Sequence, residues 1–371
     1  MTKGIRIKLA DPGITDTDKE GMLGVLDSGQ LVNGPQGAAF EQALLEVTSR
    51  KNAVVLSSGT AALLASMKAL GIGHGSTVVV PGFTFPAPAA AAAFLGADVR
   101  VCDVDRKTFC ISPATLEPLL EEDLSLVIAI DQFGMPAPTP DIEDMLSSRG
   151  IPVLVDAACS LGSYLDDQPC GSFGTASILS FHPRKVITTG EGGAVLTNYQ
   201  QVASRVRQIS NHGIKKGSFA SIGLNLRLSE IAASLGLSQL ARLDAIVERR
   251  RTLARRYQDA LPLTFQKTPP GAMTNYQTLV AVLPASLDAT RRATLIATLK
   301  EEGMEATIAS YCLAEIPHMG KRFGIDPIET PVALSLHERA MALPLHPGLS
   351  DKDVDQVIEV MQSWLYKYGI F

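Results

Sequence analysis

Lys185 and Asp156 are the residues of this sequence whose types and surroundings most clearly suggest chemistry. Lys185 lies in the stretch SFHPRKVITTGEGG, residues 180–193, between a strand-like apolar run and a glycine-rich turn. Asp156 ends a second apolar run, residues 151–155. A lysine that can form a Schiff base and an acid that can pair with a pyridinium nitrogen are the minimum that an enzyme dependent on pyridoxal 5'-phosphate (PLP) requires.

Each of these two residues also has an ordinary interpretation. Lysine is usually an exposed residue without a chemical role, and an aspartate after a strand often caps the following helix. The apolar run before Asp156 favours a functional role, because a buried ionised carboxylate is costly unless it is paired. The apolar pair Val186-Ile187 and the glycine-rich turn after Lys185 favour a functional lysine in the same way.

A phosphate-binding turn is suggested by the sequence LSSGTAAL, residues 56–63, which is typical of a strand, a tight turn and a helix start. Backbone N–H groups and the dipole at a helix N-terminus favour an anion, and the Thr60 hydroxyl adds a donor. A plain helix cap is the alternative. Phe85, which follows another strand-like run, could stack on a cofactor ring or simply pack in the core.

The elements that must position these residues are short apolar runs, most of them separated by segments long enough for helices. We predict strands at residues 53–56, 77–80, 99–104, 124–130, 151–155 and 176–180. Continuous apolar character indicates strands covered on both faces, and therefore a mainly parallel α/β sheet. Ligands bind beyond the C-terminal ends of such strands, which is where Asp156, Ser180 and residues 57–60 lie.

The last third of the chain predicts a smaller α+β domain. Residues 228–260 have helical periodicity and carry an arginine cluster at 249–256, which we interpret as a solvated helix face rather than a polyanion site. A strand-like run at 276–283, a helix near 289–302 and a final helix capped by Ser350 follow. We expect a large domain over residues 1–245 and a small one over 246–371.

Composition disfavours several classes of protein. A net charge of −5 gives no electrostatic reason to expect nucleic acid or an anionic membrane as partner. The uncharged stretch 77–97 contains prolines, so we interpret it as a strand, a loop and an alanine-rich helix rather than a membrane span. Five scattered cysteines and an N-terminus without a signal peptide indicate a cytoplasmic protein with neither a disulfide framework nor a metal site.

The sequence resembles the DegT/DnrJ/StrS family of aminotransferases, which are fold-type I PLP enzymes best known for aminating keto-sugars. The resemblance runs from about Asp18 to near the C-terminus, with its motifs in consistent order. These motifs are LSSGTAAL, ALGIGHGSTVVVPGFTF, DVDRKTF, VDAACSLG, SFHPRKVITTGEGGAV, NHGI, GLNLRLSEIAASLGLSQL and LPLHPGLSDKDVDQVI.

The resemblance implies a role for each residue that matches a family motif. Lys185 would form the Schiff base and transfer the proton, Asp156 would pair with the pyridine nitrogen, and Phe85 would stack on the ring. The phosphate would be held by Gly59, Thr60 and Ser180, and Ala61 would also belong to the cofactor-binding residues. Asn225 would reach the cofactor phosphate of a neighbouring subunit, which implies a homodimer with shared active sites.

Cys159 is the main departure from the family pattern, which usually has Gln or His at this cofactor-contacting position. A small thiol there could leave room for a different substrate or orient the cofactor less firmly. Leu224 and Leu226 stand where aromatic residues often flank the asparagine, and residues 310–318 match the family's substrate-contacting segment poorly.

The resemblance implies transfer of an amino group from L-glutamate to a keto-sugar, which in this family is usually nucleotide-linked. Amination of a cyclitol or another non-sugar ketone, and PLP-dependent elimination, remain alternatives. A non-catalytic PLP-binding regulatory protein is a third, which the complete set of lysine, aspartate and serine disfavours.

Overall fold

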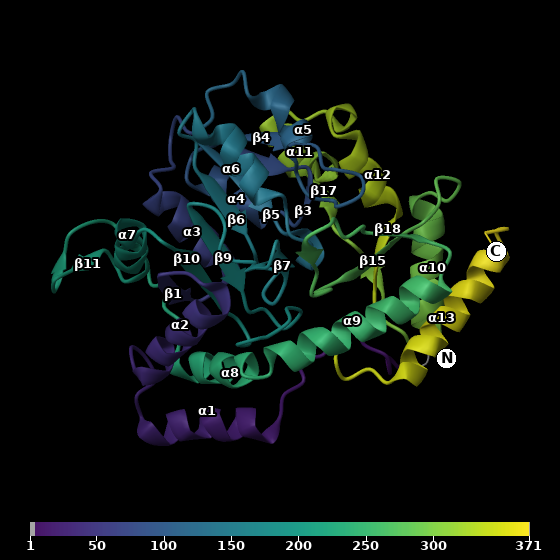
Figure 1. The fold of residues 1–371 in the computed structure, drawn as a ribbon, viewed down its shortest axis with the longest axis horizontal. Coiled ribbons are helices and arrows are strands. Elements are labelled where there is room, and N and C mark those ends of the chain that lie inside the picture. Colours follow the sequence, from purple (N-terminus) through teal and green to yellow (C-terminus); the bar gives the residue numbers. More distant parts are fainter. Residues whose placement is uncertain (1–3, 371) are drawn as a thin grey trace.

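The computed structural model describes residues 4–370, and its centre is a seven-stranded mixed sheet (Figure 1). From one edge to the other its strands are β1 (Asn52–Leu56), β10 (Gly193–Thr197), β9 (Ala176–Ser180), β6 (Val153–Asp156), β5 (Leu126–Ile130), β2 (Thr77–Pro81) and β4 (Asp98–Cys102). β10 is antiparallel to both of its neighbours, and every other neighbouring pair is parallel. All strands except β10 therefore have their C-terminal ends at one edge of the sheet.

The predicted α/β sheet is confirmed, since each of the predicted runs forms one of these strands, within a few residues at the ends. β10 is the strand that the apolar pattern does not predict. It begins at Gly193, inside the glycine-rich stretch that the sequence suggests to be only a turn. Its central residues are nevertheless fully buried, because it lies between β1 and β9.

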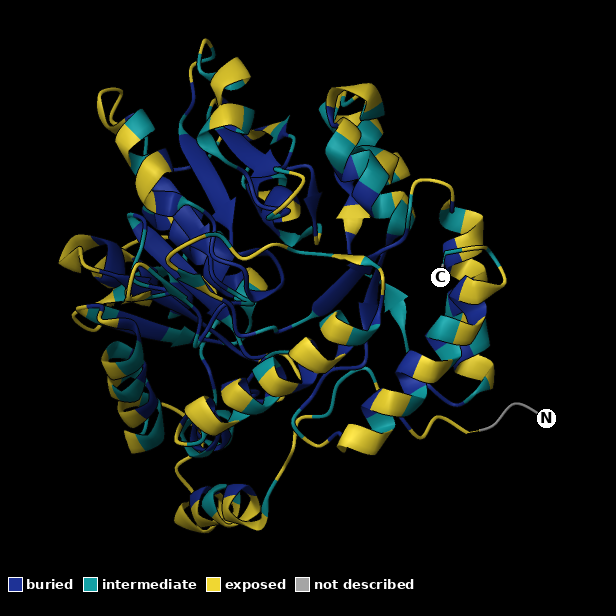
Figure 2. Cartoon of the chain, turned by 45° about the vertical axis from the view of Figure 1, so that its right-hand side comes forward, coloured by how far each residue is buried: buried dark blue, intermediate teal, exposed yellow. Residues whose placement is uncertain are grey.

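Helices cover both faces of this sheet, which is why most residues of its strands are buried (Figure 2). One face packs against α3 (Gly59–Ala69), α4 (Ala87–Phe94), α7 (Gln200–Ser210) and α11 (Pro317–Phe323). The other packs against α2 (Pro35–Thr48), α5 (Pro113–Leu116), α6 (Thr139–Ser147), α8 (Glu230–Leu240) and α12 (Pro331–Arg339). α1 (Asp16–Ser28) packs on α8, where the buried carboxylate of Asp18 pairs with Arg242 at 2.7 Å.

The C-terminal part forms a second, antiparallel sheet with its own apolar core. Its strands are, in order, β13 (Thr264–Phe265), β15 (Leu279–Val282), β18 (Ala340–Leu343) and β16 (Thr307–Ile308). Its core includes residues of α9 (Leu243–Ala260), α10 (Ala289–Glu301) and α13 (Asp351–Tyr366). The predicted cap of the last helix is confirmed, since the Ser350 hydroxyl accepts from the N–H of Asp353 at 3.2 Å.

The predicted solvated arginine face is wrong for Arg250. Residues 230–260 form two helices, α8 and α9, and Arg250 of α9 is only 2% exposed. Its guanidinium donates to the carbonyls of Tyr276, Gln277 and Leu345 at 3.0–3.2 Å, and burial lowers its pKa to about 10. A long side chain can cross from a helix surface into a neighbouring layer, which the charge pattern alone does not reveal.

Short elements complete the chain. Two small sheets have two strands each: β3 (Phe83–Thr84) with β17 (Tyr311–Cys312), and β11 (Ile214–Lys215) with β12 (Ser218–Phe219). A third has three strands: β7 (Tyr164–Leu165), β8 (Gln168–Pro169) and β14 (Ala272–Met273). Single 3-10 turns are η1 (Glu117–Leu119), η2 (Gln132–Gly134), η3 (Leu313–Glu315) and η4 (Pro327–Glu329). Among residues 4–370, no helix is long and apolar enough to cross a membrane.

Candidate active site

The two residues predicted to carry chemistry lie at the C-terminal edge of the large sheet. Asp156 ends β6 and Ser180 ends the adjacent parallel strand β9. Lys185 lies in the turn that follows β9, where its N–H donates to the carbonyl of His182 at 2.8 Å. Lys185 is half-buried, so the interpretation as an ordinary exposed lysine is wrong.

Asp156 is a buried carboxylate in need of a positive partner. It is 7% exposed; burial raises its pKa, and the positive charge of Lys185 acts in the opposite direction. Its Oδ1 accepts from the N–H of Ala158 at 3.1 Å, and it forms no ion pair within residues 4–370. The next helix, α7, begins only at Gln200, so Asp156 is not the helix cap that its position in the sequence also allowed. A protonated pyridine nitrogen fits this carboxylate.

Cys159 contacts the lysine directly. The Lys185 amine lies 3.1 Å from the Cys159 sulfur, at hydrogen-bond distance. Since Cys159 follows Asp156 in the turn after β6, the thiol, the carboxylate and the amine belong to one cluster at the ends of β6 and β9. The residue that departs from the family pattern is therefore part of the site.

The predicted phosphate turn is at the N-terminus of α3, beside Ser180. A Cβ placed on Gly59 would come within 2.8 Å of the Cβ of Ser180, so glycine allows the turn and the serine to lie this close. The Ser58 hydroxyl caps α3 by accepting from the N–H of Ala61 at 3.0 Å. The N–H groups of Gly59 and Thr60, in the first turn of the helix, have no acceptor within it. An anion fits between them and the Ser180 hydroxyl.

Phe85 projects from the chain and does not pack in the core, since it is 66% exposed. Its ring lies 6.5 Å from that of Tyr311, edge to face, and Tyr311 lies 6.4 Å from the His337 ring. β17, which carries Tyr311, pairs with β3 just before Phe85. The segment 310–318, which the sequence pattern places poorly, is thus brought next to the predicted ring-stacking residue by strand pairing.

Asn225 lies on the segment 211–227, which protrudes beside α7 with the β11–β12 hairpin (Figure 1). Its backbone pairs with Asn211, and the next residue, Leu226, accepts from the N–H of Ser57 at 2.8 Å. The Asn225 side chain is exposed. Phe219 and Ile222 on this segment are 80% and 96% exposed.

Asp131, at the end of β5, is a site-supporting residue that the sequence analysis missed. It is fully buried, and burial raises its pKa to about 7. It accepts from the Ser160 hydroxyl at 2.6 Å and from the N–H of Ala137 at 2.9 Å. Ser160 follows Cys159, so these bonds fix the turn that carries the thiol. The signal for Asp131 was its position after a buried apolar run, the same signal that singled out Asp156.

A model of the DegT/DnrJ/EryC1/StrS aminotransferase family matches residues 12–362. The chain belongs to this family. The resemblance predicted from the motifs is confirmed. The chain is an aminotransferase of a family of PLP-dependent sugar aminotransferases.

Known proteins of similar sequence or fold cover nearly the whole of this aminotransferase. The spore coat polysaccharide biosynthesis protein SpsC of Bacillus subtilis is 31% identical over 91% of this chain and 92% of its own. A DegT/DnrJ/EryC1/StrS aminotransferase from Brucella abortus is 31% identical, with a TM-score of 0.88 over 94% of this chain and 95% of its own. The predicted fold-type I architecture is thereby confirmed.

PLP is the cofactor of this family, and the fold is that of a protein solved with it. Spr1654 of Streptococcus pneumoniae has been solved in a PLP form and a PMP form, each 24% identical to this chain with a TM-score of 0.92 over 100% of both chains. At this identity the likeness shows the fold alone. The cofactor prediction is confirmed by the family.

Proposed function

We propose that this aminotransferase moves an amino group from L-glutamate to a keto-sugar, with Lys185 as the catalytic residue. The observation that supports this most directly is the cluster of Lys185, Asp156 and Cys159 at the C-terminal edge of the sheet. SpsC, named for polysaccharide biosynthesis, supports a sugar-related acceptor. A nucleotide-linked acceptor is the finer part of the proposal and comes from the family resemblance.

Each residue of the site has a defined task in this proposal. Bound PLP supplies an electron-withdrawing ring on which the bond to the substrate α-proton is weakened. Asp156 holds the pyridine nitrogen protonated by its negative charge. Lys185 binds the cofactor aldehyde and moves the proton at the substrate carbon. Phe85 covers the ring.

The phosphate group has its own set of donors in this proposal. Gly59 and Thr60 offer N–H groups at the start of α3, and the hydroxyls of Thr60 and Ser180 add two donors. Ala61 has its N–H engaged by Ser58, so we place it at the edge of this set. Cys159 contacts Lys185 and stands where the family usually has the larger Gln or His.

We further propose a cytoplasmic homodimer in which Asn225 of one subunit contacts the phosphate held by the other. The exposed, apolar segment around Asn225 supports association. The five cysteines, all unpaired, suit a reducing compartment. The division into domains at residue 245 stays a prediction, although Ile7 already belongs to the core of the second sheet.

A two-step assay tests the activity. The PLP form is mixed with L-glutamate alone, and conversion of the cofactor is followed by its visible absorbance. The converted protein is then offered keto-sugars with and without a nucleotide, and an amino product is sought by mass spectrometry. Conversion followed by amination supports the proposal, whereas release of ammonia without an amino product would favour elimination.

A further inference from the structure

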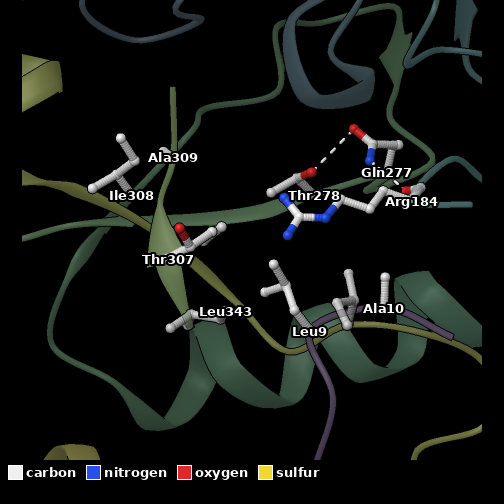
Figure 3. A pocket seen from close by; sticks show the side chains of 11 residues that line it. Leu9, Ala10, Arg184, Gln277, Thr278, Thr307, Ile308, Ala309 and Leu343 are labelled. Atoms are coloured by element: carbon white, nitrogen blue, oxygen red, sulfur yellow. Dashed lines mark hydrogen bonds between the residues drawn. The ribbon is translucent and has the colours of Figure 1, made fainter. Parts of the chain in front are cut away.

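An open cavity lies beside the turn that carries Lys185, between the N-terminal segment and the smaller sheet (Figure 3). Its volume is about 70 Å³. A water needs roughly 10–15 Å³, so the cavity admits a group of several atoms. Leu9, Arg184, Thr278, Thr307 and Leu343 contribute to its lining. Arg184 directly precedes Lys185 in the chain, which suggests that the cavity holds part of a substrate.

Arg184 is the charged side chain of this lining, and it has no partner for its charge within the described chain. Arg184 bonds through its backbone, which donates to His182 Nδ1 at 3.2 Å and accepts from Gln277 Nε2 at 2.8 Å. No hydrogen bond or ion pair of its guanidinium occurs among residues 4–370. Figure 3 shows this group extending past Thr278 toward Leu9. Arg250, by contrast, is buried with three carbonyl acceptors.

Hydrogen bonds connect the turn that contains Cys159 to the lining of the cavity. Asn275 donates through Nδ2 to the carbonyl of Cys159 at 2.9 Å, and its Oδ1 accepts from the N–H of Gln277 at 2.8 Å. The Gln277 side chain in turn holds the Arg184 carbonyl and accepts from the Thr278 hydroxyl at 3.0 Å. A short chain of hydrogen bonds thus links the backbone of Cys159 to Gln277 and Thr278 in the lining of the cavity.

We propose that this cavity binds a carboxylate of a substrate, with the Arg184 guanidinium as its cationic donor and the Thr307 hydroxyl beside it. The inference rests on the proposed function and names the anionic group that the site recognises. Arginine binds carboxylates through paired N–H donors. The apolar remainder of the lining, including Leu9 and Leu343, suits the methylene stem of an amino acid such as glutamate.

A carboxylate fits better than a nucleotide diphosphate because of its charge. One guanidinium balances one negative charge, and no lysine or second arginine lines the cavity. The carboxylate could belong to the amino donor or to an acidic acceptor, and separate assays of the two substrates distinguish these sources.

The test compares the holoenzyme with Arg184→Met, Arg184→Lys and a control, Arg255→Met. Arg255 is an exposed arginine of α9 outside the cavity lining. Glutarate, an unreactive dicarboxylate, is titrated calorimetrically into each PLP-loaded protein, and conversion by L-glutamate is measured in single turnover. Loss of a charge-assisted bond should weaken glutarate binding roughly tenfold to a hundredfold in Arg184→Met. Arg184→Lys should keep part of the affinity, and Arg255→Met all of it.

The outcomes separate the site from the activity. A weaker response to L-glutamate assigns the carboxylate to the donor, and a rise confined to the KM of an acidic acceptor assigns it to that substrate; both support the site. Unchanged glutarate affinity and unchanged KM for both substrates in Arg184→Met overturn it. Arginine-dependent glutarate binding by a protein that aminates no acceptor leaves the site standing and removes the proposed function.

A second variant guards against a folding defect in Arg184→Met. Thr307→Val removes one hydroxyl from the lining and keeps the charge. Loss of one hydrogen bond to a charged carboxylate should raise the Kd for glutarate roughly tenfold or more. An unchanged Kd in this variant counts against the proposed carboxylate position.

Discussion

The turn that contains Lys185 is fixed by buried neighbouring strands, whereas the segment that contains Asn225 is largely exposed. The first lies at the ends of buried strands, with Cys159 3.1 Å from the amine. The second protrudes from the sheet and exposes Phe219 and Ile222 almost completely. A single chain therefore preorganises the amine and the acid, whereas the asparagine segment presents apolar side chains that a second chain would cover.

This difference separates two kinds of site residue. Groups that perform proton transfer need fixed geometry, which buried neighbouring strands provide. An exposed loop contributes a contact only if association orders it, so its contribution depends on assembly. Substitutions in the first region should abolish chemistry, and those in the second should act through association.

Replacement of Lys185 by alanine should have the largest effect. PLP should still bind through Asp156 and the phosphate turn, but multiple turnover should fall by roughly 10²–10⁴-fold, the contribution of a positioned acid–base group. Steady-state rates and visible absorbance check this, with the exposed Lys352→Ala as control. In the wild type, borohydride reduction should attach PLP to Lys185, and an adduct on another lysine would contradict the assignment.

Asp156→Asn should have the next largest effect, again within the preorganised region. The substitution removes the charge that holds the pyridine nitrogen protonated. A neighbouring opposite charge shifts a pKa by about one to three units, so the rate should fall roughly 10–10³-fold while PLP stays bound. Asp18→Asn is the matched control, because it also neutralises a buried carboxylate but lies outside the cluster at the ends of β6 and β9. Equal rates in the two variants would reduce Asp156 to a structural residue.

Ile222→Ser tests whether the exposed segment is an interface. Since Ile222 is 96% exposed in the single chain, the substitution should change the free energy of unfolding of that chain by no more than about 0.5 kcal/mol. Burial of an isoleucine contributes roughly 1.5–3 kcal/mol, so the dissociation constant of the dimer should rise about tenfold or more. Sedimentation equilibrium measures this, with Ile328→Ser, 77% exposed outside the segment, as control. Identical dissociation constants would remove the segment from the interface.

Mixed dimers should show the smallest effect, a factor of about two. Lys185→Ala and Asn225→Ala chains should each be poorly active as homodimers. In a mixed dimer, one site carries both lesions, and the other keeps its own Lys185 and receives an intact Asn225. Activity should recover to about half of the wild type if the sites are independent. No recovery after verified subunit exchange would place Asn225 in its own chain's site.

The sequence by itself determined the chemistry and most of the large sheet. Lys185 and Asp156 stand after short apolar runs, and such runs suit strands of a sheet that helices cover on both faces. Residues that directly follow such strands therefore lie at the C-terminal edge of a parallel sheet, where ligands bind. The family motifs predicted the cofactor for a similar reason, since each motif is a continuous stretch of sequence.

Only the tertiary structure decided what depends on pairing between distant segments. The contact of Cys159 with Lys185, the β17–β3 pairing that brings Tyr311 to Phe85, and the burial of Arg250 each join residues far apart in the chain. β10 was missed for the same reason, because its burial comes from the two strands beside it. Local patterns report which face of an element is apolar, but the partner that covers it is chosen by the packing of the whole chain.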